Sequence, residues 1–260
     1  MKGVNMENRN LINTLVFEKN NRISGGIYHK LQIDFSYNSN HIEGSRLTHE
    51  QTRYIFETQT VGIEPTKVND IFETVNHFRC FDSIIDTVAA PLSEGYIKNI
   101  HFMLKTGTMS GGNDEAVIGD YKKYANFVGT TETTAPENVA EEMQTLLLNY
   151  NALEKVSLYD ILDFHACFEK IHPFYDGNGR VGRLIMFKEC LKNDIVPFYI
   201  DDMQKMYYYR GLQNWQSGGE KGFLADTCLL MQDNMKKILD HFEIDYDKTP
   251  TAASDVLGGR

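Results

Sequence analysis

The sequence lacks an apolar run long enough to cross a membrane, and its first residues, MKGVNMENRN, have no apolar segment after the lysine. A membrane-spanning helix needs about 18 or more apolar residues in succession, so neither an anchor nor an export signal is predicted. Only four cysteines occur, and none is paired at the spacing of metal ligands. Isolated cysteines in apolar helical patterns are typical of a reducing compartment, so we expect a cytoplasmic protein.

Positive charge is also scarce. The chain has 26 Lys and Arg against 36 Asp and Glu, which gives a net charge of -10. Because an acidic surface repels nucleic acid and anionic lipid, neither a nucleic acid nor a membrane is an expected partner. The 260 residues, 42% of them hydrophobic, are enough for one sizeable core and do not require two.

Alternating apolar patterns are rare, and most of the chain shows the i, i+3, i+4 apolar spacing of amphipathic helices. The sequence therefore predicts an all-α bundle. One stretch, around residues 106–130, is rich in glycine, threonine and asparagine and predicts a small β-hairpin. The expected organisation is a helical N-terminal region over residues 1–65, a core domain over 66–245 and a disordered tail over 246–260.

The stretch HPFYDGNGRVGR, His172 to Arg183, places unusual residues together. Pro173 should end the preceding helix, because its ring removes a backbone donor, and a new helix should begin a few residues later. Gly177 and Gly179 leave the loop amides uncovered, and the amides at the start of the new helix point to the same place. This arrangement predicts an anion cradle.

Charged side chains beside the cradle suit a nucleotide phosphate. Arg180 and Arg183 share one face of the new helix and can clamp several phosphate oxygens. Asp176 is placed to hold Mg²⁺ or Mn²⁺ next to phosphate, and His172 can take a proton from an incoming hydroxyl near neutral pH. Each residue alone has an ordinary structural interpretation, but the set predicts attack on a nucleotide phosphate.

The same stretch resembles the signature of the Fic family, HPFx(D/E)GNGRxxR, and matches it at every fixed position. The resemblance implies a Fic-like helical bundle and a protein adenylyltransferase, which transfers AMP from ATP to a Ser, Thr or Tyr hydroxyl and releases pyrophosphate. It implies His172 as the general base, Asp176 as the metal ligand and Phe174 as a core anchor of the loop. The implied phosphate-binding residues are Gly177, Asn178, Gly179, Arg180 and Arg183.

Gly179 bears on the group that is transferred. The related Doc branch, which phosphorylates its targets, has a lysine at this position, so the glycine favours nucleotidyl transfer. The signature reads phosphates better than bases, and transfer of UMP or of phosphocholine remains an alternative.

Residues 119–129, GDYKKYANFVG, resemble the flap of the family, a hairpin that holds the target protein by strand addition. The resemblance implies that Tyr121, Lys122 and Tyr124 belong to the target-binding flap. Lys122 departs from the usual pattern, in which arginine is commoner. An ordinary surface hairpin is the alternative interpretation.

The stretch NSNHIEG, Asn38 to Gly44, resembles the inhibitory motif (S/T)xxxE(G/N) in the N-terminal position of class II members of the family. The resemblance implies that Ser39 and Glu43 belong to an inhibitory helix, with Glu43 paired to Arg183 in place of an outer phosphate of ATP. Without the signature, the same residues would be interpreted as a helix end with a glycine cap.

Three functions fit these motifs: a self-inhibited adenylyltransferase, a phosphodiesterase that removes AMP with Glu43 orienting water, and a nucleotide-sensing interaction module. Tyr207 or Tyr208, in YYYRGLQNW, is expected either to stack on adenine or to lie in the core. Self-modification is expected beside modification of a target, and the apolar N-terminal helices are compatible with a homodimer.

Overall fold

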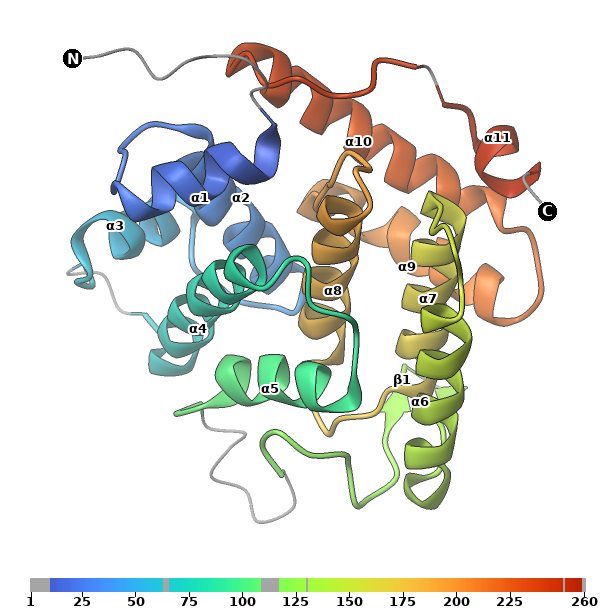
Figure 1. Cartoon of the computed structure of the whole chain (residues 1–260). Helices are drawn as coiled ribbons and strands as arrows, with labels where there is room; N and C mark the ends of the chain where they lie inside the picture. The colour runs from blue at the N-terminus through green and yellow to red at the C-terminus, as the bar shows by residue number, and fades with distance from the viewer. Residues whose placement is uncertain (1–9, 63–65, 109–116, 130, 250, 259–260) are drawn as a thin grey trace.

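The computed structural model describes residues 10–62, 66–108, 117–129, 131–249 and 251–258. Within these ranges nearly all of the regular secondary structure is helical, and α8 runs through the middle of the molecule (Figure 1). The all-α prediction is confirmed. The elements are α1 (Leu11–Asn20), α2 (Ile27–Ile42), α3 (His49–Thr58), α4 (Val68–Asp86), α5 (Glu94–Lys105), β1 (Phe127–Val128), β2 (Thr131–Glu132), α6 (Pro136–Asn151), α7 (Leu158–Ile171), α8 (Asn178–Lys192), the 3-10 helix η2 (Asp202–Gln204), α9 (Lys205–Gln216), α10 (Gly222–His241) and α11 (Ala253–Gly258).

Helix starts follow the local sequence. Thr48 and Gln51 form a reciprocal capping box at α3, and Ser157 with Asp160 forms another at α7. Pro136 occupies the first turn of α6, where its missing amide hydrogen costs nothing. These local signals mark the beginnings of three helices.

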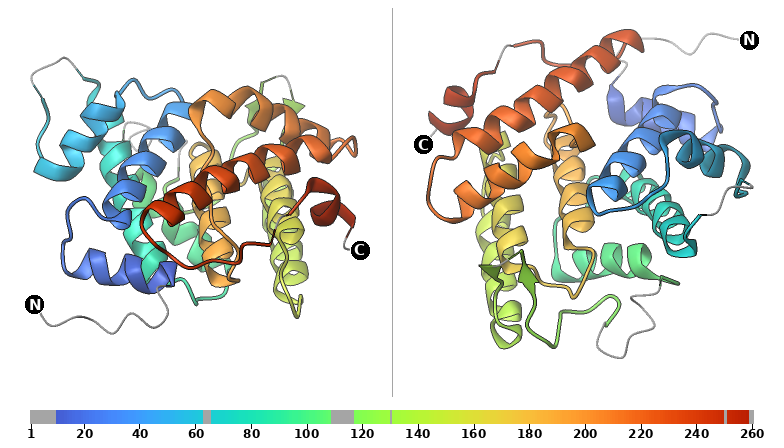
Figure 2. Two further views of the ribbon diagram at one scale, coloured as in Figure 1. Left: turned by 90° about the horizontal axis from the view of Figure 1, so that it is seen from above. Right: turned by 180° about the vertical axis from the view of Figure 1, so that it is seen from behind.

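Helix α8 is buried on both of its sides. Leu184 and Phe187 belong to a first apolar cluster, with side chains from α1, α2, α4 and α5, while Met186 and Cys190 belong to a second cluster with α7, α9 and α10. The views in Figure 2 agree that α8 has helices on either side. The N-terminus of this central helix is therefore rigidly held, and it carries the HPFYDGNGRVGR stretch.

The strands β1 and β2 form the predicted hairpin, which is only two residues long on each side. They pair antiparallel, with Phe127 opposite Glu132 and Val128 opposite Thr131. Residues 109–116 and 130 of the expected flap region lie outside the described residues.

The prediction of a disordered tail is wrong for residues 251–258, which include helix α11. Val256 is 8% exposed and packs in the second apolar cluster, and Ala253 and Leu257 lie against the same cluster. A segment of six residues is too short to show a helical period, so its order comes from this packing and could not be predicted from its pattern.

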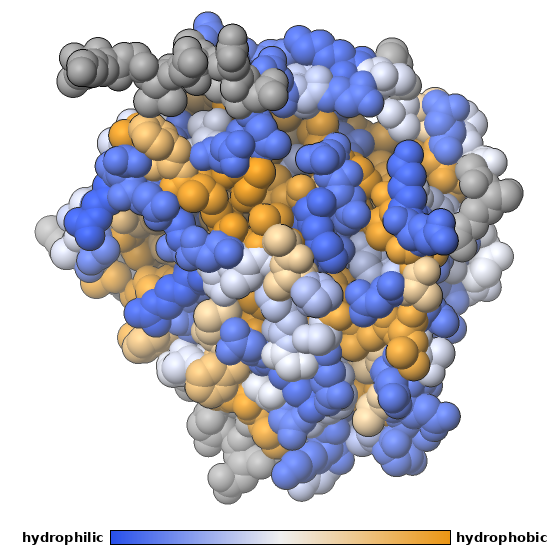
Figure 3. All heavy atoms as spheres, viewed as in Figure 1, coloured by the Kyte–Doolittle hydropathy of each residue, from blue (hydrophilic) through white to orange (hydrophobic). Residues whose placement is uncertain are grey.

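Surface chemistry fits the composition. In the part of the chain that the structure describes, no helix combines the length and the apolar character needed to span a membrane. The face drawn in Figure 3 mixes hydrophilic and hydrophobic residues.

All four cysteines are unpaired, and burial raises the pKa of the Cys80 thiol to about 12, so that this thiol is unreactive at neutral pH.

Three buried histidines should make the fold sensitive to mild acid. Burial lowers the pKa of His77 and His165 to about 3 and that of His101 to about 4, from 6.5 in an unfolded chain. Below pH 6.5 the unfolded chain therefore binds more protons than the folded one, and each histidine should reduce the free energy of unfolding by about 1.4 kcal/mol per pH unit. His172, whose pKa is also lowered to about 4, acts in the same direction. Glu169, whose pKa burial raises to about 8, has the opposite sign and offsets about one of these four histidines.

Urea unfolding at pH 6.5 and pH 5.0 measures this dependence. We expect a marked loss of stability at the lower pH and a shallower loss in His77→Gln, which removes one titrating group. Equal stability at the two pH values would show that these histidines are protonated in the folded state.

Candidate functional site

The loop between α7 and α8 has the backbone that its sequence predicts. His172 caps α7 in the left-handed region, with φ of 52°, and Gly177 precedes α8 with φ of 88°. The positive φ at Gly177 is the conformation that favours glycine. The loop therefore delivers the first amides of α8 and the His172 side chain to one place.

Two side chains fix this loop from inside. Asn178 accepts a hydrogen bond from the Phe174 amide and donates one to the Phe174 carbonyl, both at 2.8 Å. Phe174 is fully buried and stacks on His101, with ring centroids 3.8 Å apart. Phe174 thus anchors the loop as expected, whereas the Asn178 amide, expected at the α-phosphate, braces the loop backbone.

His101 joins the loop to the segment that precedes the hairpin. Its Nδ1 accepts a hydrogen bond from the Gly119 amide at 3.0 Å, and its Nε2 lies 3.0 Å from the Asp176 carbonyl. A neutral imidazole that donates from Nε2 satisfies both contacts, in agreement with its lowered pKa. His101 therefore has a structural role, in which it joins Gly119 to the loop at Asp176.

Glu43 lies directly over the cradle. It caps the C-terminus of α2, and its Oε1 accepts a hydrogen bond from Arg183 Nη2 at 2.7 Å. Ser39 contributes its hydroxyl and carbonyl oxygens, at 3.1 and 2.9 Å from the same guanidinium. Gly44 follows the helix with a φ of 94°. The stretch is therefore a helix end with a glycine cap, and it also brings Glu43 to Arg183.

The opposite charges of Glu43 and Arg183 stabilise each other. Burial disfavours the Glu43 carboxylate, but Arg183 and Arg180 outweigh it and hold the pKa of Glu43 below its usual value. A Cβ atom added at Gly179 would come within 2.4 Å of Glu43 Oε1, so no side chain fits there while Glu43 is in place. Glu43 therefore occupies the space beside the amides of the cradle.

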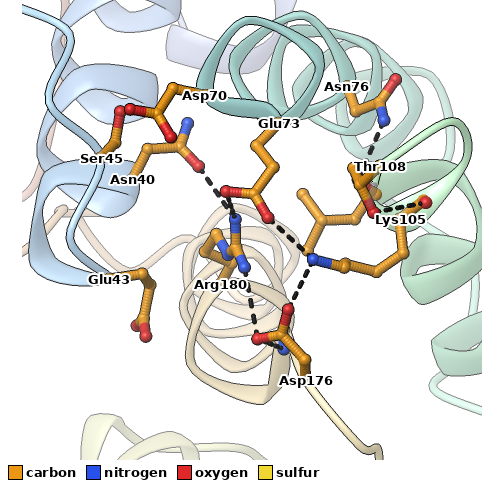
Figure 4. Close-up of polar contacts among 12 residues, drawn as sticks. Asn40, Glu43, Ser45, Asp70, Glu73, Asn76, Lys105, Thr108, Asp176 and Arg180 are labelled. Carbon is orange, nitrogen blue, oxygen red and sulfur yellow. Dashed lines mark hydrogen bonds and ion pairs between the residues drawn. The ribbon is translucent and has the colours of Figure 1, made fainter. Parts of the chain in front are cut away.

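Figure 4 shows a second group of charges next to the cradle, made by Glu73, Lys105, Asp176 and Arg180. Arg180 Nη1 donates to Glu73 Oε2 at 2.7 Å, and Arg180 Nη2 lies 3.6 Å from Asp176 Oδ1. Lys105 Nζ lies 2.8 Å from Glu73 Oε1 and 2.6 Å from Asp176 Oδ2. Both arginines expected to clamp phosphate are thus bound to a glutamate, Arg183 to Glu43 and Arg180 to Glu73.

Asp176 fits a divalent ion that takes most of its ligands from elsewhere. Its side chain is 43% exposed beside the cradle, and Mg²⁺ commonly uses one or two carboxylates together with phosphate and water. No group of three or more His, Cys, Asp or Glu residues that could hold a metal occurs among the described residues. Asp176 therefore suits a metal that arrives with a phosphate ligand.

His172 is neutral at physiological pH. Burial, and secondly the charge of Lys122, lower its pKa to about 4. Its Nδ1 atom is buried and has no hydrogen-bond partner in the described part of the chain. A neutral imidazole is able to accept a proton from a hydroxyl group.

Lys122 joins the segment before the hairpin to the loop between α7 and α8. It is 3% exposed, its amide donates to the Pro173 carbonyl at 2.9 Å, and its Nζ donates to the Ile171 carbonyl at 3.3 Å. Tyr121 packs against Phe174, with centroids 5.9 Å apart, and only Tyr124, 52% exposed, is open to a partner. Of the three predicted flap residues, two lie inward and one is available for a target.

The two tyrosines expected near adenine differ in their exposure on α9. Tyr208 is fully buried and its hydroxyl lies 2.7 Å from His165 Nε2, so it takes the core position that was the alternative for this pair. Tyr207 is 61% exposed and is the member of the pair that a base can reach.

Sequence reasoning did not identify Glu73 and Lys105. Each lies on an amphipathic helix, α4 or α5, where a charged residue is normally assigned to the solvated face. Only Lys105 had a sequence feature that could have drawn attention to it. It directly follows Leu104, at the end of the apolar stripe of its helix.

The fold and the loop define a helical bundle with an anion cradle at the N-terminus of its central helix. Residues 91–190 match the family model described as Fic/DOC family, so the chain carries a Fic/DOC domain. Glu43 and the stretch that resembles an inhibitory motif lie outside the matched residues.

The chain is homologous to proteins named "Protein adenylyltransferase Fic". It is 24% identical to that of Drosophila mojavensis over 212 residues, 78% of this chain and 40% of the relative. It is 26% identical to that of Drosophila persimilis over 208 residues, 78% of this chain and 39% of the relative. The chain therefore spans about two fifths of the length of these curated relatives.

Solved structures support the same fold. A Fic domain containing signaling protein from Bacteroides thetaiotaomicron superposes with a TM-score of 0.70 at 19% identity, over 96% of this chain and 97% of that chain. Fic-1 from C. elegans superposes with a TM-score of 0.69 at 18% identity, over 89% of this chain and 71% of that chain.

Proposed function

We propose that this protein is a self-inhibited protein adenylyltransferase, which moves AMP from ATP to a Ser, Thr or Tyr hydroxyl of a target protein or of itself and releases pyrophosphate. The observation that carries the proposal is the position of Glu43, bound to Arg183 over the cradle, next to the neutral base His172. The homology to Fic adenylyltransferases supports the reaction class.

The phosphate site is formed by groups that already face the cradle. Arg183 Nη1 is buried without a hydrogen-bond partner among the described residues and lies 3.0 Å from the place of a Cβ atom at Gly179. An unsatisfied buried guanidinium hydrogen is costly unless a ligand uses it. The first amides of α8 add a partial positive charge at the same point, which suits the phosphates of ATP.

In the proposed reaction, the target hydroxyl oxygen attacks the α-phosphorus, and the bond from that phosphorus to the oxygen bridging to the β-phosphorus breaks. His172 takes the hydroxyl proton, since its imidazole is neutral at pH 7. The cradle amides stabilise charge on the α-phosphate, and Arg183 holds the outer phosphates once Glu43 has left it. Mg²⁺ or Mn²⁺ on Asp176 would supply charge neutralisation of the leaving phosphates.

Inhibition follows from competition for Arg183. While Glu43 occupies the guanidinium, the cradle contains a carboxylate where an outer phosphate of ATP belongs, and two negative groups in one place repel each other. ATP is then excluded or held with its α-phosphate out of line with the attacking hydroxyl. Glu43 must leave before transfer can occur.

The target is proposed to bind along the flap. β1 has exposed apolar side chains, Phe127 at 63% and Val128 at 49%, and Tyr124 precedes it. A strand added to a short hairpin gains main-chain hydrogen bonds and places a hydroxyl side chain near the loop that Lys122 anchors.

The position of the radioactive label in ATP tests which group is transferred. In Glu43→Gly protein with Mg²⁺, label from the α-phosphate should become covalently attached to protein, and label from the γ-phosphate should appear only in released pyrophosphate. Retention of γ-label on the protein would mean phosphorylation and would overturn the proposal. Parallel reactions with labelled UTP measure the nucleotide preference.

A further inference from the structure

The ion pairs of Lys105 are unusual because they are almost inaccessible to solvent. Lys105 is 2% exposed and Glu73 is 8% exposed, whereas the Asp176 side chain is 43% exposed. Lys105 connects the two acids, since its Nζ is 2.8 Å from Glu73 Oε1 and 2.6 Å from Asp176 Oδ2. In Figure 4 this ammonium points between α4 and the loop that carries Asp176.

The amount of buried charge argues for a role beyond stability. Burial of an ion pair has a desolvation cost that often equals or exceeds the attraction gained, so apolar side chains would hold α4 and α5 together equally well. Although burial favours a neutral Glu73, Arg180 and Lys105 keep its pKa below the usual value, so the acid remains charged. Glu73 therefore provides Lys105 with a permanent counter-ion inside the protein.

Asp176, unlike Glu73, is partly exposed to solvent. Asp176 Oδ2 lies 2.6 Å from Lys105 Nζ, Asp176 Oδ1 accepts a hydrogen bond from the Gly177 amide at 2.7 Å, and 43% of the side chain remains exposed. A divalent cation that binds there approaches an oxygen already in contact with an ammonium group, and the two positive charges repel at short range. Lys105 cannot escape into solvent, but it can give up Asp176 and keep Glu73.

We propose that Lys105 is a positioning residue that competes with divalent cations for Asp176, and that Glu73 sets the strength of the competition by holding Lys105 when the cation binds. The inference rests on the proposed function in one respect, the use of Asp176 as the metal carboxylate. In this arrangement the protein keeps Asp176 in place without a metal and raises the metal concentration that the site requires.

Charge changes at the two residues should act with opposite signs. Lys105→Met removes the cation nearest to Asp176, while Arg180, 2.7 Å from Glu73 and 3.6 Å from Asp176, remains as a counter-ion, so the metal should bind about tenfold more tightly. Glu73→Gln removes the alternative partner of Lys105 and leaves the ammonium to Asp176, so the metal should bind several-fold more weakly. Loss of packing alone would weaken binding in both variants.

Mn²⁺ binding measured by electron paramagnetic resonance tests this inference without any turnover. The protein carries Glu43→Gly to open the cradle, and the probe is Mn²⁺ with the α,β-methylene analogue of ATP, which cannot transfer AMP. Lys105→Met and Glu73→Gln are compared with Asp176→Asn, which defines the binding that depends on the carboxylate.

Opposite shifts for Lys105→Met and Glu73→Gln support the proposal. Weaker binding in both variants, or no change in either, overturns it, and so does unchanged Mn²⁺ affinity in Asp176→Asn. If thermal unfolding shows that Lys105→Met does not fold, Glu73→Gln decides, and tighter binding there contradicts the proposal. Transfer of α-label by Glu43→Gly is scored separately, so failure of this inference is distinguishable from failure of the proposed function.

Discussion

Replacement of Glu43 by glycine should raise the rate of AMP incorporation by about tenfold to a hundredfold, because a charge-assisted hydrogen bond of about 1.5–3 kcal/mol no longer holds Arg183. The structure gives the reason. Glu43 Oε1 is 2.7 Å from Arg183 Nη2, and its removal frees the guanidinium for an outer phosphate of ATP. The measurement is the initial rate of protein labelling from α-labelled ATP.

Two further variants separate charge from shape. Glu43→Gln keeps the length of the side chain but loses the negative charge, so it should raise the rate by less than Glu43→Gly does. Glu50→Ala changes an acid on α3 whose side chain is 75% exposed and should leave the rate unchanged. An unaltered rate in Glu43→Gly contradicts inhibition by this residue.

The phosphodiesterase alternative predicts the opposite sign. If Glu43 orients a water molecule for removal of AMP from a modified protein, Glu43→Gly abolishes removal. Incubation of an AMP-modified protein with wild type and Glu43→Gly therefore distinguishes the two reactions by the direction of the effect.

Replacement of His172 by alanine in the Glu43→Gly protein should reduce labelling by at least about a hundredfold, the usual contribution of a general base. Lys122 and burial hold the pKa of His172 far below neutrality, so at pH 7 the histidine is ready to accept the hydroxyl proton. The same rate assay measures the loss.

His172→Asn serves as the matched variant. His172 has a φ of 52°, a conformation that asparagine tolerates better than most residues, so the loop should keep its shape while the base is lost. We expect the asparagine variant to be as inactive as the alanine variant, with unchanged thermal stability. Full activity of His172→Asn would exclude His172 as the base.

Local sequence was sufficient to predict the loop and its surroundings. Pro173 ends α7, the glycine at 177 permits a positive φ, and α8 starts at Asn178, all of which depend on backbone chemistry within a few residues. The contact between Glu43 and Arg183 spans 140 residues and was expected only through the family resemblance. No local rule brings α2 onto α8.

Residues whose role depends on tertiary packing were not predictable in the same way. Lys105 and Glu73 become partners because α4 and α5 converge on the loop at Asp176, and neither helix shows this in its own pattern. The choice between Tyr207 and Tyr208 depends on the rotation of α9, which is fixed by the contact of Tyr208 with His165. Helix α11 similarly depends on burial of Val256.

The most direct test of the central claim is a comparison of wild-type, Glu43→Gly and Glu43→Gly/His172→Ala proteins, each incubated with α-labelled ATP and Mg²⁺ and assayed for label on protein. A self-inhibited adenylyltransferase gives low labelling in the wild type, strong labelling in the single variant and background labelling in the double variant. Absence of label from all three proteins, or equal labelling with and without His172, would contradict the account.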